Sequence, residues 1–70
     1  MKEKNQLRKV REERLLGKAE LAREAGVSVL TITRIENGEA SRPKTKRQIL
    51  AALNIPLEDR ERVFPGDPDS

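Results

Sequence analysis

The chain has 70 residues, 39% of them charged, and a formal net charge of +3, which gives room for one small domain and favours a polyanionic partner. It contains no cysteine and no histidine, which excludes disulfide bonds, a zinc finger and catalysis by a cysteine or histidine nucleophile. No signal-peptide pattern follows Met1 and no apolar run reaches the roughly 18 residues of a membrane span, so we expect a cytoplasmic protein.

The first part of the chain predicts two helices. Strong helix-forming residues run over positions 4–15, and Gly17 interrupts them. The sequence KAELAREAG at positions 18–26 predicts a second, short helix that ends at Gly26. The residues expected to face the core in these helices recur three or four positions apart: Leu7, Val10, Arg11, Leu21, Ala22 and Ala25.

Residues 28–37 include β-branched side chains that would suit a strand, but their spacing favours a helix. At about 100° per residue, Ile32 and Ile35 fall on one side, while Leu30 and Arg34 fall on the other. In a strand, Leu30, Ile32 and Arg34 would share one face, and no polar side would remain. We therefore predict a third helix over 28–37.

The second and third predicted helices are joined by a very short turn. Gly26 can close the second helix in the left-handed conformation, and Ser28 can cap the start of the third. Two helices joined in this way cross closely, and Ala22 supplies the small residue that a close crossing requires. Gly38 then ends the third helix. The spacing predicts a helix-turn-helix.

The rest of the chain predicts two more helices. Thr45 and Gln48 form a capping-box pattern that would open a fourth helix, with Asn54 as its stop. Residues 58–64 predict a short fifth helix, and residues 65–70 are expected to be a disordered tail. The apolar residues expected in the core of this half are Ile49, Leu50, Leu53, Val63 and Phe64.

Together these elements predict an all-α fold, a compact bundle of four to five short helices in a domain of residues 1–64. The pattern resembles the Cro/C1-type (XRE) helix-turn-helix family, a lambda-repressor-like domain, over residues 5–57. The stretches that carry the resemblance are LRKVREER, AELAREAGVSVLTITRIENG and ILAALNIPLE. The resemblance implies that helix 28–37 lies in the major groove of DNA and that Arg11 pairs with Glu36.

The resemblance also implies a set of contacts with DNA. Base-edge contacts are expected from Val29, Leu30, Thr33 and Arg34. Backbone contacts are expected from Lys18, Asn37, Arg42 and Lys44. They are also expected from Lys46 and Arg47, because two cations at the start of a helix oppose its macrodipole and a phosphate would supply the anion. The aliphatic side chains would meet thymine methyl groups, and the arginine of helix 28–37 can present its planar fork to guanine.

The chain departs from the family pattern at two places. Many family members begin the first helix of the motif with serine or asparagine followed by glutamine, whose side chain touches phosphate and braces a recognition residue. Here Gly17 and Lys18 stand instead, so we expect Lys18 to neutralise a phosphate and the bracing by an amide to be lost. Family members also often carry glycine where Leu15 stands, so the turn there is expected to differ locally.

The predicted function is sequence-specific binding of double-stranded DNA by a small transcriptional repressor, acting as a homodimer on a palindromic operator. We expect no metal or nucleotide cofactor, and the lack of a Gly-rich phosphate loop argues against an enzyme. The alternative is an antitoxin-like or adaptor module that docks protein through an apolar patch, formed by Val29 and Leu30 or by Val63 and Phe64. A further interpretation is a DNA-binding fragment that works only within a larger assembly.

Overall fold

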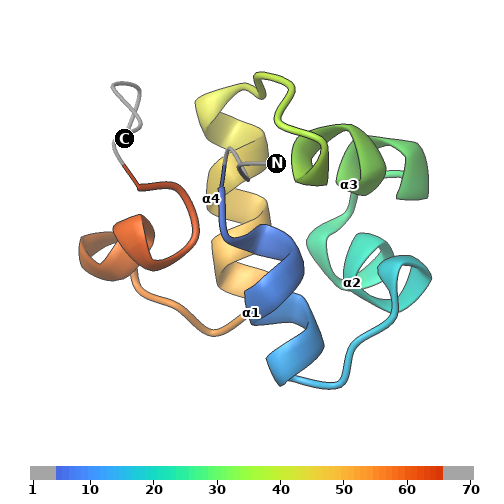
Figure 1. Ribbon diagram of the computed structural model, residues 1–70, viewed down its shortest axis with the longest axis horizontal. Helices are drawn as coiled ribbons and strands as arrows, with labels where there is room; N and C mark the ends of the chain where they lie inside the picture. The colour runs from blue at the N-terminus through green and yellow to red at the C-terminus, as the bar shows by residue number, and fades with distance from the viewer. Residues whose placement is uncertain (1–4, 66–70) are drawn as a thin grey trace.

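The computed structural model describes residues 5–65, and these form four α-helices and one 3₁₀ helix (Figure 1). The helices are α1 (Leu7–Glu13), α2 (Lys18–Ala25), α3 (Val29–Glu36), α4 (Pro43–Ala52) and the 3₁₀ helix η1 (Leu57–Arg62). No strand occurs in this part of the chain, and the predicted all-α fold is confirmed. The tail expected at 65–70 lies, apart from its first residue, outside the described residues.

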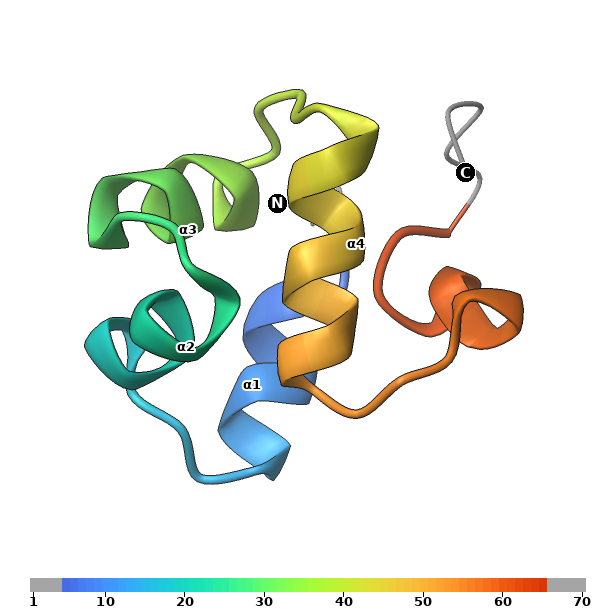
Figure 2. The ribbon, with the colours of Figure 1, turned by 180° about the vertical axis from the view of Figure 1, so that it is seen from behind.

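Helix α4 runs through the middle of the molecule, with α2 and α3 on one side and η1 on the other (Figures 1 and 2). Helix α2 packs against both α3 and α4, and α1 packs against α3. The core residues between them are Leu7, Val10, Leu21, Ala22, Ala25, Ile32, Ile35, Ile49, Leu50, Leu53, Ile55, Val63 and Phe64. Within residues 5–65, no helix is long and apolar enough to cross a membrane, and no three His, Cys, Asp or Glu side chains form a group that could hold a metal ion.

The boundaries of α2 and α3 agree with the predicted caps. Gly26 closes α2 in the left-handed conformation with a φ of 74°, and Gly38 follows α3 with a φ of 94°. The side chain of Ser28 accepts a hydrogen bond from the backbone N–H of Thr31 at 3.1 Å, as an N-cap residue does. Because these signals act within one turn of the chain, they could be read without tertiary information.

The prediction for the start of α4 is wrong. The helix begins at Pro43 rather than at Thr45, with Arg42 as its N-cap residue and no hydrogen bond from a capping side chain. Proline is favoured in the first helical turn because its ring fixes φ at a helical value and its missing N–H would have no partner there. This local preference prevails over the capping-box pattern of Thr45 and Gln48.

The first and last helices are shorter than predicted. Helix α1 starts at Leu7, where the side chain of Asn5 accepts the backbone N–H of Leu7 at 3.0 Å. Helix η1 ends at Arg62, so Val63 and Phe64 follow it rather than belong to it. Both of these side chains are nonetheless buried, as predicted.

Leu15 adopts a left-handed conformation, with a φ of 57°, and its side chain is 90% exposed. This is a conformation that glycine adopts without a steric penalty, so the turn keeps a glycine-type geometry with a leucine in it. We expect Leu15→Gly to raise the free energy of unfolding by about 1 kcal/mol, because the strain of the Cβ is removed and little packing is lost. Thermal unfolding followed by circular dichroism measures the change.

Asn54 provides a matched control for this substitution. It has a φ of 60°, but asparagine tolerates the left-handed region, so Asn54→Gly should leave the stability nearly unchanged. A Leu15→Gly protein that melts no higher than the parent would show that the leucine side chain offsets the strain of its backbone.

Candidate nucleic-acid interface

Helix α3 is held to the core by one face and exposed on the other. Ile32 and Ile35 are almost completely buried, with 0% and 2% of their surfaces exposed. Val29, Leu30 and Arg34 lie on the opposite side and are exposed. This division agrees with the helical spacing of the sequence, and it leaves the outer face of the helix exposed.

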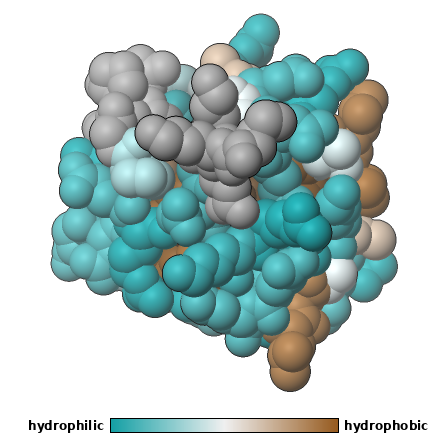
Figure 3. All heavy atoms as spheres, in the orientation of Figure 1, coloured by the Kyte–Doolittle hydropathy of each residue, from teal (hydrophilic) through white to brown (hydrophobic). Residues whose placement is uncertain are grey.

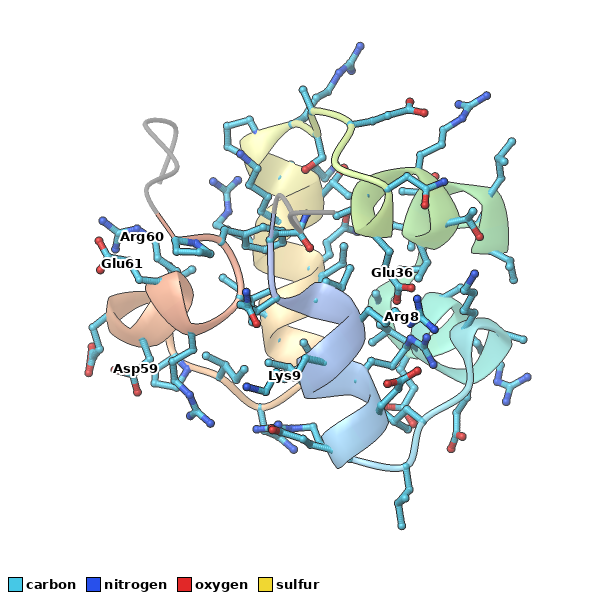
Figure 4. All side chains as sticks on the ribbon, viewed as in Figure 1. Arg8, Lys9, Glu36, Asp59, Arg60 and Glu61 are labelled. Carbon is cyan, nitrogen blue, oxygen red and sulfur yellow. The ribbon has the colours of Figure 1, made fainter. Side chains whose placement is uncertain are left out.

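A buried ion pair fixes the C-terminal end of α3 to α1. The Nε atom of Arg11 donates to the Oε2 atom of Glu36 at 2.7 Å, and the two side chains are only 9% and 4% exposed. The Nη1 atom of Arg11 also donates to the carbonyl of Leu16 at 2.8 Å. Figure 4 shows Glu36 pointing from α3 towards α1. The pairing that the family resemblance implied is confirmed.

The same ion pair stabilises the charged form of the arginine. The hydrogen bond that Arg11 donates to Glu36 raises the pKa of Arg11 above its ordinary value, although burial acts in the opposite direction. The stability that this shift contributes is present at neutral pH and would be lost only as the pH rises through the raised pKa. Arginine is protonated throughout the pH range used for folding and binding experiments, so the pair keeps its cation there.

A second contact at the same end of α3 was missed by the sequence reasoning. The Nδ2 atom of Asn5 donates to the carbonyl of Ile35 at 2.7 Å, across 30 positions of the chain. An asparagine before a helix is readily interpreted as a purely local contact, and the side chain of Asn5 does accept the backbone N–H of Leu7. Nothing in the sequence indicates that its amide nitrogen reaches a distant helix.

The first turn of α3 presents mainly aliphatic surface. Val29 is 44% exposed and Leu30 is 55% exposed. The hydroxyls of Ser28 and Thr31 lie 2.9 Å apart and form a hydrogen bond with each other. Figure 3 shows hydrophobic atoms along the outer edge of the molecule beside α3. A surface of this kind can make contacts with methyl groups but offers few side-chain hydrogen bonds.

The second apolar patch proposed from the sequence, Val63 and Phe64, is not exposed to solvent. Val63 is 0% exposed and Phe64 is 4% exposed, so both belong to the core. The suggestion that they form a docking patch is wrong, because η1 places them against the rest of the bundle instead of towards solvent.

Thr33 and Lys18 are brought together by the crossing of α2 and α3. The Nζ atom of Lys18 donates to the Oγ1 atom of Thr33 at 3.5 Å. The sequence led us to expect that the bracing of a recognition residue is lost, because the amide is absent. In the structure an ammonium group makes a contact with α3 in its place.

The predicted backbone-contact residues are exposed, with one exception. Asn37, Arg42, Lys44 and Arg47 are exposed, and the loop after α3 and the start of α4 lie at the same end of the molecule as α3 (Figures 1 and 2). Lys46 is only 8% exposed, and its Nζ atom lies 5.8 Å from the centre of the Phe64 ring. This cation–π contact and its burial count against a phosphate contact for Lys46.

Helices α2 and α3 are joined by a short turn, and α3 packs on the core with one face and exposes the other. This arrangement defines a helix-turn-helix domain. A family model described as "Helix-turn-helix domain" matches residues 5–63, and the chain belongs to this family. The chain is similar to the HTH-type transcriptional repressor RghR of Bacillus subtilis (strain 168), with 49% identity over 55 residues. The match covers 76% of this chain and 41% of RghR, so the chain spans less than half the length of this relative. The predicted Cro/C1-type helix-turn-helix domain is confirmed.

Proposed function

We propose that the chain binds double-stranded DNA sequence-specifically and acts as a transcriptional repressor, with α3 in the major groove. The observation that carries this proposal is the placement of α3, whose inner face and C-terminal end are locked to the core while its outer face stays free. An α-helix fits the major groove of B-DNA, where each base pair presents a distinct pattern of groups. The similarity to a protein named a transcriptional repressor supports the same function.

Each part of the surface has a role in this proposal. Val29 and Leu30 contact thymine methyl groups, and Arg34 donates to a guanine. The exposed cations beside α3 contact phosphates and set the position of the domain on the duplex. A single α3 spans only a few base pairs, so we propose that two domains bind a palindromic operator as a homodimer. The proposal assigns no chemical reaction to the chain.

Selection of bound sequences from a pool of random duplexes tests the proposal. We expect enrichment of one palindromic motif, and an affinity for it that falls steeply as the salt concentration rises, because phosphate contacts release counterions. If no motif is enriched, the surface does not read sequence. If binding to a protein partner instead persists at high salt, the aliphatic part of α3 is better explained as a protein-docking patch.

The contact of α3 with thymine methyl groups can be tested on the selected motif. Replacing one thymine at a time by uracil removes a methyl group, and at the position read by Leu30 we expect affinity to fall about threefold to fivefold, the value of one buried methyl group. Replacement of cytosine by 5-methylcytosine at other positions should have no such effect. Titrations monitored by fluorescence anisotropy measure these changes.

Leu30→Ala supplies the control on the protein side. The alanine side chain is too short to reach the methyl group, so the variant should bind the thymine and uracil duplexes equally. Leu57, which is 51% exposed on η1, gives the matched substitution away from α3, and Leu57→Ala should retain the full uracil effect. A uracil effect that survives in Leu30→Ala would assign the contact to another residue.

A further inference from the structure

Lys18 occupies an unusual place for a lysine. It is the first residue of α2, where the partial positive charge of the helix N-terminus disfavours a cation. Its side chain is exposed, yet its Nζ atom reaches across the helix crossing to the Oγ1 atom of Thr33 on α3, 3.5 Å away. The contact therefore joins the two helices of the motif at the outer surface.

The contact limits what the hydroxyl of Thr33 can do. A hydroxyl can donate one hydrogen bond and accept two, whereas an ammonium group can only donate. The oxygen of Thr33 must therefore accept from Lys18, and its proton points elsewhere. Within residues 5–65, this hydroxyl makes no other hydrogen bond, so the proton is not used by the carbonyl of the preceding turn of α3.

The charge of Lys18 acts on the same hydroxyl. A hydroxyl that accepts a hydrogen bond from a cation becomes a stronger donor, since hydrogen bonds in a chain polarise one another. A positive charge beside the hydroxyl also favours acceptor atoms over amino groups. In the major groove, the acceptors are N7 of purines, O6 of guanine and O4 of thymine, while cytosine presents an amino donor.

We propose that Lys18 is a positioning residue that sets the base preference of Thr33. It makes Thr33 a hydrogen-bond donor, which selects a base with an acceptor in the major groove and rejects cytosine at that position of the contacted strand. Lys18 thus contributes to sequence choice through Thr33, in addition to any phosphate that its two remaining N–H groups contact. This inference rests on the proposed function.

The test uses the motif selected by the parent protein. The base pair faced by Thr33 is the one at which Thr33→Val, which removes the hydroxyl and keeps the shape, relaxes the selection. Affinities for four duplexes that differ only at this base pair are then measured at one salt concentration. We expect the parent to prefer acceptor bases over cytosine by roughly threefold to tenfold, the value of one net hydrogen bond. Lys18→Met should abolish this preference and keep the preference at the other base pairs.

Two further measurements separate this role from a phosphate contact. In a Thr33→Val background, Lys18→Met should cause no further change in preference at this base pair, because the residue through which it acts is gone. Lys44→Met, a matched substitution at an exposed lysine on α4, should weaken binding to all four duplexes by the same factor. Circular dichroism of the free proteins confirms that each variant is folded.

The outcomes distinguish the two proposals. If the parent binds one motif selectively and Lys18→Met lowers affinity equally for all four duplexes, the positioning role is wrong and the DNA-binding function stands. If Lys18→Met reduces the preference by the same factor in the parent and in the Thr33→Val background, Lys18 reads the base directly. That result would also overturn the positioning role. If the parent selects no motif, both proposals fail.

Discussion

Glu36→Gln is expected to lower the free energy of unfolding by about 3–5 kcal/mol, which would leave a domain of this size largely unfolded at 37 °C. The substitution keeps the shape of the side chain but removes the charge that neutralises Arg11. The guanidinium would then remain in a site where the side chain is 9% exposed, without the carboxylate to which it donates. Urea denaturation monitored by circular dichroism measures the loss.

The chain offers a matched control for this experiment. Arg8 and Glu12 form a second arginine–glutamate pair with an Nε–Oε2 distance of 3.3 Å, but their side chains are 65% and 57% exposed. Glu12→Gln should therefore change the free energy of unfolding by less than about 0.5 kcal/mol. Equal effects of Glu12→Gln and Glu36→Gln would show that burial does not determine how much the Arg11–Glu36 pair contributes to stability.

A double substitution shows whether the loss comes from an unpaired charge. The double variant Arg11→Met with Glu36→Leu removes both charges of the buried pair and fills the space with apolar groups. Such replacements of buried ion pairs are often neutral or stabilising, so the double variant should be more stable than Glu36→Gln alone. A double variant as unstable as the single one would point to lost geometry, for example the bond from Arg11 to the carbonyl of Leu16.

Arg34→Ala is expected to weaken binding to the selected motif by about 1–3 kcal/mol and to remove the preference for guanine at one base pair of each half-site. Arg34 lies exposed in the last turn of α3, one turn beyond Leu30, as the proposed contact with guanine requires. Two parallel hydrogen bonds to O6 and N7 of guanine cannot be reproduced at other base pairs. Titrations against the matched duplex and duplexes with one mismatch measure both effects.

Lys44→Ala is the comparison that separates recognition of a base from electrostatic contact with phosphate. Its side chain is exposed in the first turn of α4, where we propose a phosphate contact. It should weaken binding to all duplexes alike and reduce the slope of log K against log salt by about one. If Arg34→Ala also weakens all duplexes alike, Arg34 contacts phosphate, and the guanine preference must come from elsewhere on α3.

The predictions for Glu36→Gln and Arg34→Ala both concern how the C-terminal end of α3 is attached to the core. The contacts of Arg11 and Asn5 hold the C-terminal end of α3, which is the part of the helix that carries Arg34. A reading helix must keep its side chains in a fixed position relative to the bases, since small displacements break hydrogen bonds that depend on direction. A partly folded Glu36→Gln protein is therefore expected to lose selectivity together with stability.

The sequence by itself determined the helix-turn-helix and most of the core. The helical spacing of Ile32 and Ile35, the cap at Ser28 and the left-handed closure at Gly26 are signals that act within one or two turns, and each is present in the structure. The start of α4 could not be chosen in the same way, because Pro43 and Thr45 both provide valid local signals. The outward face of α3 followed from its buried face.

Tertiary structure alone decided which side chains meet across the helices. The link from Lys18 to Thr33 spans 15 positions, and that from Asn5 to Ile35 spans 30, while the ring of Phe64 reaches Lys46 from the far end of the chain. The Arg11–Glu36 pair was expected only through the family resemblance. Such contacts depend on how deeply the helices pack and how they are rotated about their axes. The depth and rotation of each helix result from the packing of the whole core, so they cannot be predicted from a local pattern of residues.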